Sequence, residues 1–218
     1  LYGEALLSQL KADGLNVACC QVPAGEASKC ANMVDHVLSA AYDNKLSRSD
    51  VIVALGGGVV GDLAGYCAAI YLRGLAFVQI PTTLLAQVDS SVGGKVGINF
   101  KDIKNAVGAF YQPKAVYIDP NALNTLSERE FKAGLAEVYK YALIETTCTN
   151  GESGFFETLQ AYVNNTDKNL NISDLIYRCC EIKAKTVIAD ELEKSGTRAF
   201  LNLGHTFGHA YEALGDYN

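Results

Sequence analysis

A glycine-rich turn that directly follows an apolar run limits the possible folds of this chain more than any other segment. Residues 51–55 read Val-Ile-Val-Ala-Leu, and residues 56–62 read Gly-Gly-Gly-Val-Val-Gly-Asp before a helix-forming stretch. This matches the G-x-G-x-x-G pattern, in which a pyrophosphate approaches the backbone at a helix N-terminus. The acidic residue that usually follows about 20 positions later has no clear counterpart. A dinucleotide would therefore bind differently from a standard Rossmann protein, and a tight turn without a ligand is the simpler alternative.

Strand and helix signals alternate through the first half of the chain. Apolar runs predict strands at residues 16–22, 51–55, 75–80 and 115–118. Helical patterns occur at residues 4–11 and 28–41, the second with an apolar stripe of Met33, Val34, Val37 and Leu38. Nearly all-apolar strands that alternate with helices predict a parallel sheet covered on both faces.

The pattern changes after Pro120, where strand signals end. Ser127 and Glu130 fit a capping box, which begins a helix expected to run to about Leu143. Residues 147–171 are polar and partly loop, and residues 174–189 are again helical. The predicted fold class is α/β: a parallel-sheet, Rossmann-like nucleotide-binding domain at residues 1–121, followed by an α-helical metal- and substrate-binding domain at residues 122–218.

Composition excludes several classes of protein. The 218 residues are 49% hydrophobic and 19% charged, with a net charge of −6, which argues against a general binder of nucleic acid or anionic membranes. No apolar run approaches the roughly 20 residues of a membrane span, and the N-terminus shows no basic region followed by an apolar stretch, so no signal peptide is visible. The seven cysteines form no CxxC pair, which predicts reduced thiols and a cytoplasmic location. Each adjacent pair, Cys19-Cys20 and Cys179-Cys180, is expected to place one thiol in a core.

A second polar segment follows the predicted strand at 75–80. Residues 81–95 read Pro-Thr-Thr-Leu-Leu-Ala-Gln-Val-Asp-Ser-Ser-Val-Gly-Gly-Lys. Hydroxyl groups at a strand end are natural ligand contacts, and the Ser-Ser and Gly-Gly-Lys steps are typical of an anion-binding loop. A solvated loop with scattered lysines is the alternative, and the density of Gly, Ser, Thr and Lys argues against it.

Two of the three histidines, His205 and His209, are spaced i, i+4 near the C-terminus. On a helix both imidazoles lie on one face, which suits a divalent metal or a metal ligand beside a proton-transfer group. Two histidines that cap and pack a helix start are the structural alternative.

A carboxylate and an ammonium group, Glu137 and Lys140, lie i, i+3 among apolar residues of the predicted capped helix. Such a pair is usually exposed, but this sequence context predicts that part of its face is buried, and buried charges need partners or a metal. Three further cations, Arg73, Lys183 and Arg198, complete a set suited to an acidic substrate.

Six stretches, in order along nearly the whole chain, resemble the 3-dehydroquinate synthase family. They are PAGEASK (23–29), GGGVVGDLAGYCAAIYLRG (56–74), PTTLLAQVDSSVGGKVGIN (81–99), KNAVGAFYQPKAVYID (104–119), EREFKAGLAEVYKYALI (128–144) and RAFLNLGHTFGHAYEA (198–213). The resemblance implies conversion of 3-deoxy-D-arabino-heptulosonate 7-phosphate to 3-dehydroquinate and phosphate, a step of the shikimate pathway. NAD transiently oxidises a ring hydroxyl, phosphate is eliminated, the hydride returns, and an intramolecular aldol reaction closes the carbocycle.

The resemblance also assigns roles to individual residues. NAD contacts are implied for Glu26, Lys29, Gly57, Gly58, Asp62, Thr82, Thr83, Lys104, Ala122, Leu123, Asn124 and Thr125. A divalent metal, zinc or cobalt, is implied at Glu137 and His205. Substrate contacts are implied for Arg73, Asp89, Lys95, Asn105, Lys140, Lys183, Arg198 and Asn202. Catalytic roles fall on His209, which matches a histidine implicated in proton transfer, and on Lys95, Lys140 and Glu193.

Two departures from the family accompany the resemblance. The third metal-binding histidine is expected beyond residue 213, and the chain ends at Asn218 without it. The N-terminal strands of the family are also missing, so the resemblance implies a fragment. We expect the isolated chain to bind metal poorly and to turn over little substrate, since a catalytic metal generally has three protein ligands.

Three alternatives stay open on the sequence alone. Iron-type alcohol and glycerol dehydrogenases share the glycine turn and a helical metal domain, but they typically lack the Asp89–Lys95 loop. Another sugar-phosphate cyclase is a closer rival, against which Asn105, Lys140 and His209 favour the dehydroquinate branch. A non-catalytic nucleotide-binding remnant is the third. The family implies a homodimer, with a small sugar phosphate as the partner molecule and neither nucleic acid nor a membrane.

Overall fold

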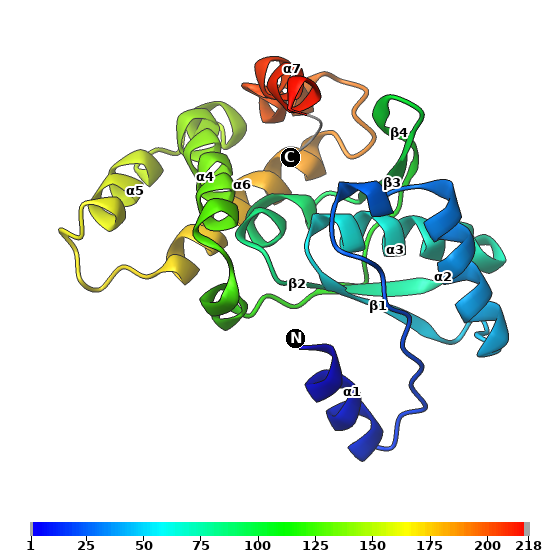
Figure 1. Cartoon of the computed structure of the whole chain (residues 1–218). Coiled ribbons are helices and arrows are strands. Elements are labelled where there is room, and N and C mark those ends of the chain that lie inside the picture. The colour runs from blue at the N-terminus through cyan, green and yellow to red at the C-terminus, as the bar shows by residue number, and fades with distance from the viewer. Residues whose placement is uncertain (1, 216–218) are drawn as a thin grey trace. The chain divides into compact units, whose positions relative to one another are not determined.

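The computed structural model describes residues 2–215, without the side chains of residues 209, 212 and 213 (Figure 1). The chain divides into two compact units. The first contains residues 1–81 and 94–118, and the second contains residues 82–93 and 119–218. The segment Thr82–Gly93 thus belongs with the helical unit, whereas the sequence-based division placed it with the nucleotide-binding domain.

In the part of the chain that the structure describes, the first unit is built from five strands and three helices. Its helices are α1 (Gly3–Ala12), α2 (Ala31–Asp43) and α3 (Gly58–Ile70), with short 3₁₀ turns η1 (Glu26–Ser28) and η2 (Tyr71–Arg73). Its strands are β1 (Val51–Gly56), β2 (Ala76–Pro81), β3 (Lys95–Phe100), β4 (Ile103–Phe110) and β5 (Ala115–Val116).

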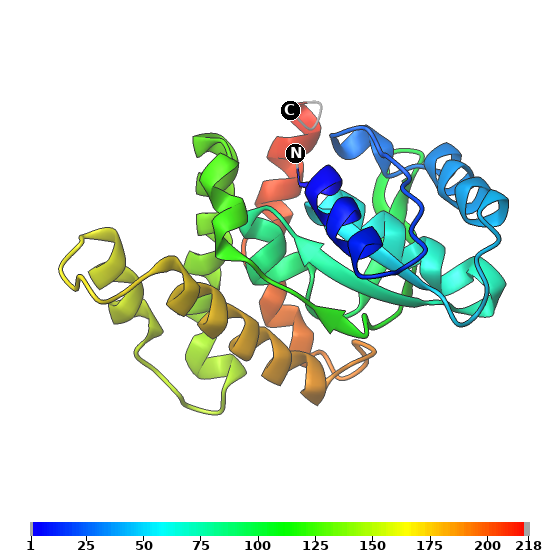
Figure 2. The same ribbon diagram turned by 90° about the horizontal axis from the view of Figure 1, so that it is seen from below.

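The parallel sheet is confirmed, in the order β1-β2-β5, and Figures 1 and 2 show its strands side by side. Helix α3 packs on the sheet, and its Ala68 shares a fully buried cluster with Phe77 of β2. The expectation that both faces are covered is wrong within the described part of the chain. Val51 and Val53 of β1 are 48% and 43% exposed, because α3 covers one face of the sheet only.

The predicted strand at 16–22 is also wrong. These residues pair with no strand of the described structure, and both Cys19 and Cys20 are exposed. An apolar run becomes a strand only when a neighbouring strand satisfies its backbone groups, and the sequence does not show whether that partner exists. The matching expectation for Cys179-Cys180 is confirmed, since Cys179 is buried and Cys180 is partly exposed.

A hairpin of β3 and β4 lies where sequence analysis predicted no strand. The two strands pair antiparallel, with Gly97 opposite Gly108. A side chain at Gly97 would lie 2.6 Å from the carbonyl oxygen of Val107, so the pair of glycines permits close approach of the two backbones. Glycine weakens an isolated strand signal, which is why the sequence pattern concealed this hairpin.

The second unit is helical. It contains a π-helical turn η3 (Ala86–Ser90), the 3₁₀ segments η4 (Pro120–Thr125) and η5 (Thr197–Asn202), and helices α4 (Glu128–Cys148), α5 (Phe155–Val163), α6 (Ile172–Ala189) and α7 (His205–Leu214). The N-cap of α4 is confirmed, with the Ser127 hydroxyl accepting a hydrogen bond from Glu130 N at 3.3 Å. The helix continues to Cys148 instead of ending near Leu143.

The turn η3 packs against both α4 and α6. Gly134 of α4 makes this packing possible, because a side chain there would lie 2.6 Å from Leu84 Cβ and 2.7 Å from Leu85 N. Around this contact, Tyr141 of α4 and Ile182 of α6 are fully buried. The segment before β3 is therefore held in the helical core, and this placement carries Asp89 into the interior of the second unit.

Candidate active site

Asp89, at the end of η3, is the centre of a buried charge cluster in the second unit. Lys183 of α6 donates hydrogen bonds from Nζ to Asp89 Oδ1 at 2.9 Å and to the Asp89 carbonyl oxygen at 2.7 Å. Lys140 Nζ of α4 lies 3.7 Å from the same Oδ1. The structure thus brings together three of the predicted substrate-binding residues, which are up to 94 positions apart in the sequence.

Tyr141 is a fourth member of this cluster and was missed by sequence analysis. Its hydroxyl donates a hydrogen bond to Asp89 Oδ1, and its ring lies 4.9 Å from Lys140 Nζ. The sequence signal available for Tyr141 was its position next to Lys140, but a tyrosine on an apolar helix face is usually interpreted as a core residue.

The electrostatics of the cluster fix its protonation state near neutral pH. Burial alone would raise the pKa of Asp89, but Lys183, Lys140 and the Tyr141 hydroxyl outweigh burial and hold that pKa well below its ordinary value. Burial and the neighbouring Asp89 raise the pKa of Tyr141 well above its ordinary value. Asp89 is therefore an acceptor and Tyr141 a donor, with the Lys140 and Lys183 side chains almost wholly buried around them.

Glu137 lies one turn before Lys140 on α4 and forms an ion pair with its Nζ. The oxygen in this pair, Glu137 Oε2, is buried, and the Lys140 ammonium group lies directly against it. An ionised carboxylate has about four lone-pair sites, so it can accept the ammonium group and still bind a further ligand. The predicted metal ligand is thus a buried carboxylate that is already paired with one cation.

Arg198 of η5 extends the positive side of the cluster. It is 2% exposed, and its guanidinium donates to the carbonyl oxygens of Glu191 at 2.9 Å and Gly93 at 3.4 Å. Gly93 has φ of +109°, and a side chain there would lie 3.0 Å from Arg198 Nη2 and 3.5 Å from Lys183 Cε. Arg198 and Lys183 therefore flank the same glycine. Within residues 2–215, Arg198 Nε and the buried Ser91 Oγ have no hydrogen-bond partner.

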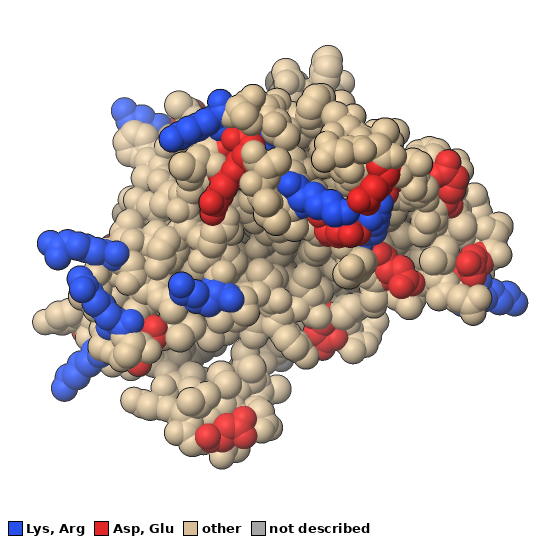
Figure 3. All heavy atoms as spheres, turned by 180° about the vertical axis from the view of Figure 1, so that it is seen from behind, with Lys and Arg blue, Asp and Glu red and all other residues tan. Residues whose placement is uncertain are grey.

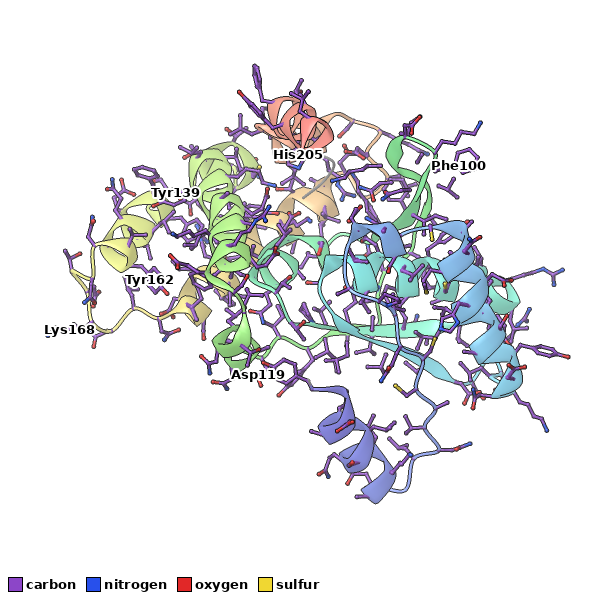
Figure 4. The ribbon with its side chains drawn as sticks, in the orientation of Figure 1. Phe100, Asp119, Tyr139, Tyr162, Lys168 and His205 are labelled. Carbon is purple, nitrogen blue, oxygen red and sulfur yellow. The ribbon has the colours of Figure 1, made fainter. Side chains whose placement is uncertain are left out.

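The remaining candidates of the second unit are less enclosed. His205 begins α7 and is partly exposed, with Nδ1 3.4 Å from Leu203 O (Figure 4). Asn202 is exposed, and Glu193 has φ of +56° in the loop after α6. The side chain of His209 lies outside the described residues. No group of three or more metal-binding side chains occurs in the described part of the chain, so the pairing of Glu137 with His205 stays a prediction.

A second polar network, in the first unit, joins several of the predicted NAD contacts. Lys29, only 5% exposed, donates to Asp62 Oδ2 at 2.7 Å and to Asn105 Oδ1 at 2.5 Å, and lies 3.8 Å from Glu26 Oε1. Asn99, which sequence analysis missed, donates to Glu26 and accepts from Asn105 N, both at 2.9 Å. Asn105 was predicted to contact substrate, and the structure places it with the cofactor candidates.

The other predicted residues are distributed over both units. Gly57 is the N-cap of α3 and Gly58 its first residue. Two further glycines of this turn serve packing: a side chain at Gly56 would lie 2.8 Å from Val60 Cγ2, and one at Gly61 2.5 Å from Gln79 Oε1. In the first unit Arg73 and Lys95 are exposed and Lys104 is partly exposed.

Two sets of predicted NAD contacts belong to the second unit. Thr83 Oγ1 accepts a hydrogen bond from Ala86 N at 3.2 Å and so caps the turn that carries Asp89, and Thr82 precedes it. The predicted segment Ala122–Thr125 lies in η4, where Leu123 is buried. The Leu123 side chain is therefore part of the core and not a contact on the surface.

The fold defines the class of this protein. Two solved structures share it: 2-epi-5-epi-valiolone synthase from Streptomyces hygroscopicus with NAD⁺ and Zn²⁺ bound, and 2-deoxy-scyllo-inosose synthase complexed with carbaglucose-6-phosphate, NAD⁺ and Co²⁺. Their TM-scores are 0.84 and 0.76, each at 28% identity, covering 97% and 96% of this chain and 58% and 57% of theirs. The chain thus has the Rossmann-like fold of sugar-phosphate cyclases.

The sequence places the chain within that class. The family model for "3-dehydroquinate synthase N-terminal" matches residues 19–133, and that for "3-dehydroquinate synthase C-terminal" matches residues 134–218. Curated 3-dehydroquinate synthases from Caldanaerobacter subterraneus and a Synechococcus strain are 52% and 49% identical over 100% and 99% of the chain. The chain belongs to the 3-dehydroquinate synthase family. It spans 60% and 57% of the lengths of these two relatives.

The dehydrogenase alternative rests on fold alone. A butanol dehydrogenase from Thermotoga maritima has a TM-score of 0.60 at 18% identity over 98% of this chain and 58% of its own. On the face drawn in Figure 3, basic and acidic side chains are interspersed, unlike the continuous basic patch of a nucleic-acid binder. None of the helices in the described range is long and apolar enough to cross a membrane.

Proposed function

We propose that this chain carries the catalytic residues of a 3-dehydroquinate synthase, which converts 3-deoxy-D-arabino-heptulosonate 7-phosphate to 3-dehydroquinate and phosphate. The observation that carries the proposal is the buried cluster of Asp89, Lys140 and Lys183, with Arg198 beside Lys183. All four are residues for which family resemblance implies substrate contacts.

The charges of this cluster suit the proposed substrate. Lys140, Lys183 and Arg198 supply three positive charges, against the carboxylates of Asp89 and Glu137. Lysine and arginine side chains that are shielded from water bind carboxylate and phosphate groups strongly. The proposed substrate carries one group of each kind. Asp89 is held as a carboxylate and accepts a hydrogen bond from a substrate hydroxyl.

The cofactors in this proposal are NAD and a divalent metal, zinc or cobalt. The buried Glu137 Oε2 and the imidazole of His205 would hold the metal, and carboxylate with imidazole is a donor set that suits both ions. When bound, the metal polarises substrate oxygens and NAD accepts and returns a hydride. Lys29, Asp62 and the N-terminus of α3 would contact NAD in the first unit.

Proton transfer in this proposal falls to the residues for which the family resemblance implies catalytic roles. His209 moves protons, since an imidazole can gain and lose a proton near neutral pH. Lys95, Lys140 and Glu193 assist as acid, base or charge partner. The α/β unit binds NAD, and the helical unit, which includes the segment Thr82–Gly93 with Asp89, binds metal and substrate. A cytoplasmic homodimer completes the proposal by family analogy.

The test is phosphate release from the heptulosonate substrate. It uses the 218-residue chain alone and an extended chain, in which the segments beyond the matched region come from the Caldanaerobacter relative. We expect the extended chain with NAD and Zn²⁺ to release phosphate without net change in NADH absorbance, and the short chain to release little. Lys183→Met should lower the rate at least about a hundredfold, because it removes a charged contact inside a buried site.

The control is Lys132→Met, since Lys132 is 70% exposed and pairs with an exposed glutamate on α4. Absence of phosphate release from the extended chain would overturn the proposed function. A net change in NADH absorbance with an alcohol would favour the dehydrogenase alternative instead. Equal rates for the short and extended chains would refute the expectation that the short chain is nearly inactive.

A further inference from the structure

Asp89 is unusual in how its contacts are shared between its two oxygens. The side-chain donors Lys183, Lys140 and Tyr141 all approach Oδ1. Among the described residues no hydrogen bond or ion pair reaches Oδ2, and 22% of the Asp89 side chain remains exposed. The donors therefore hold the carboxylate by Oδ1 and leave Oδ2 available to a ligand.

Of the three groups on Oδ1, the two lysines alone do not fix the carboxylate. An ammonium group is a nearly isotropic charge on a flexible stem and attracts either oxygen equally well. A phenol hydroxyl on a rigid, fully buried ring has a single direction of donation. Only the Tyr141 hydroxyl therefore distinguishes Oδ1 from Oδ2.

We propose that Tyr141 is a positioning residue of this site: its hydroxyl fixes the Asp89 carboxylate on Oδ1, so that Oδ2 faces a hydroxyl group of the bound sugar phosphate. The proposal rests on the proposed function for the identity of the ligand, but the placement of Asp89 by Tyr141 is independent of it. Tyr141 acts through Asp89 and touches no reacting atom.

The hydrogen-bonding and charge states are consistent with this role. The pKa of Tyr141 lies well above its ordinary value because of burial and the neighbouring carboxylate, so the hydroxyl remains a donor across the neutral range. The ring also lies beneath Lys140 Nζ, at 4.9 Å from the ring centroid. Tyr141→Phe keeps this ring and removes the hydroxyl alone.

The test compares Tyr141→Phe with Tyr139→Phe on the same helix. Tyr139 is 39% exposed, points outward from α4 in Figure 4, and has no hydrogen bond within the described residues. In the extended chain, we expect Tyr141→Phe to raise KM and to lower kcat/KM about tenfold, which is the usual effect of losing one hydrogen bond to a charged group. Thermal midpoints of the wild type and both variants should agree within a few degrees.

A double-mutant cycle with Asp89→Asn separates positioning from packing. Because Tyr141 acts through the Asp89 carboxylate, Tyr141→Phe should change kcat/KM little further in the Asp89→Asn background, with rates measured at high enzyme concentration. An equal loss in both backgrounds, together with a lowered thermal midpoint, would mean that Tyr141 is only a packing residue. A wild-type KM in Tyr141→Phe would likewise overturn the proposal.

A spectroscopic readout keeps the inference separate from the proposed function. The ¹³C carboxyl resonance of Asp89 at neutral pH reports its hydrogen bonds in the 218-residue chain without substrate. We expect it to shift in Tyr141→Phe and to remain in place in Tyr139→Phe. If the extended chain releases no phosphate, the proposed function fails, and this resonance alone decides whether Tyr141 positions Asp89: an unshifted signal would overturn the inference.

Discussion

The two polar networks of this protein differ in how completely their hydrogen-bonding groups are satisfied. In the first unit, Lys29 donates to Asp62 and Asn105, and Asn99 ties Glu26 to Asn105. In the second unit, the groups around Asp89 include two buried atoms without hydrogen-bond partners among the described residues, Ser91 Oγ and Arg198 Nε. Both networks join residues far apart in the sequence, yet within the described part of the chain only the second has this remaining capacity.

This difference separates a network whose groups are paired without a ligand from one that a ligand would complete. Native proteins satisfy nearly all buried polar groups, so unsatisfied buried atoms indicate a place where a ligand can bind. Charged side chains that are buried for binding also weaken the folded state, because their desolvation is compensated only in part. The Lys29 network joins Lys29 to α3 and β4 and has its groups paired without a ligand, whereas the Asp89 cluster is arranged for a ligand with acidic and hydroxyl groups.

The largest expected effect comes from removing the central charge of each network. Asp89→Ala leaves Lys140 and Lys183 as buried cations and should lower the free energy of unfolding by about 3–5 kcal/mol. Asp62→Ala leaves Lys29 with Asn105 and Glu26 as partners, and should lower the free energy of unfolding by about 1–2 kcal/mol. Urea denaturation measures both. Equal losses would show that the two networks are equally compensated and would break the comparison.

The stability of the fold should also depend on pH through the buried Asp89 carboxylate. The pKa of Asp89 in the folded chain lies below the unfolded value of about 3.9. A lowered pKa means that Asp89 stabilises the fold above the unfolded pKa, and that this contribution is lost as pH falls through the folded pKa. Wild type should therefore lose more stability than Asp89→Asn between about pH 5 and pH 3. Parallel curves in urea titrations at several pH values would contradict the assignment.

Sequence analysis predicted the fold more fully than the site. The strands of the parallel sheet and the long helices followed from apolar periodicity and caps, such as Ser127 on α4. The strand at 16–22 failed and the β3–β4 hairpin was missed, because strand pairing depends on a partner that local patterns do not show. Asp89, Lys140 and Lys183 were identified by resemblance, but Tyr141 was not, since its role follows from a hydroxyl direction that only coordinates reveal.

Substitution of a closely packed glycine near each network should lower the stability of the fold by a smaller amount. Gly134→Ala places a methyl group 2.6 Å from Leu84 Cβ and 2.7 Å from backbone Leu85 N, so α4 and the segment before Asp89 must separate. We expect a loss of about 1–3 kcal/mol. In Gly61→Ala the added methyl group would lie 2.5 Å from Oε1, at the end of the Gln79 side chain. Because this flexible side chain can move, the loss of stability should be smaller. Thermal unfolding of the two variants compares them, and the reverse order would contradict this interpretation.

The smallest effect is expected at the exposed pair of Lys132 and Glu128, which supplies the reference for both networks. The two side chains are 70% and 81% exposed and lie 2.6 Å apart on α4, at the same i, i+4 spacing that stabilises isolated helices. Water screens such a pair, so Lys132→Ala should change the free energy of unfolding by less than about 0.5 kcal/mol, and added salt should reduce the change further. The measurement is urea denaturation at low and high salt. A loss comparable to that of Asp62→Ala would mean that burial is not what separates the two internal networks from the surface.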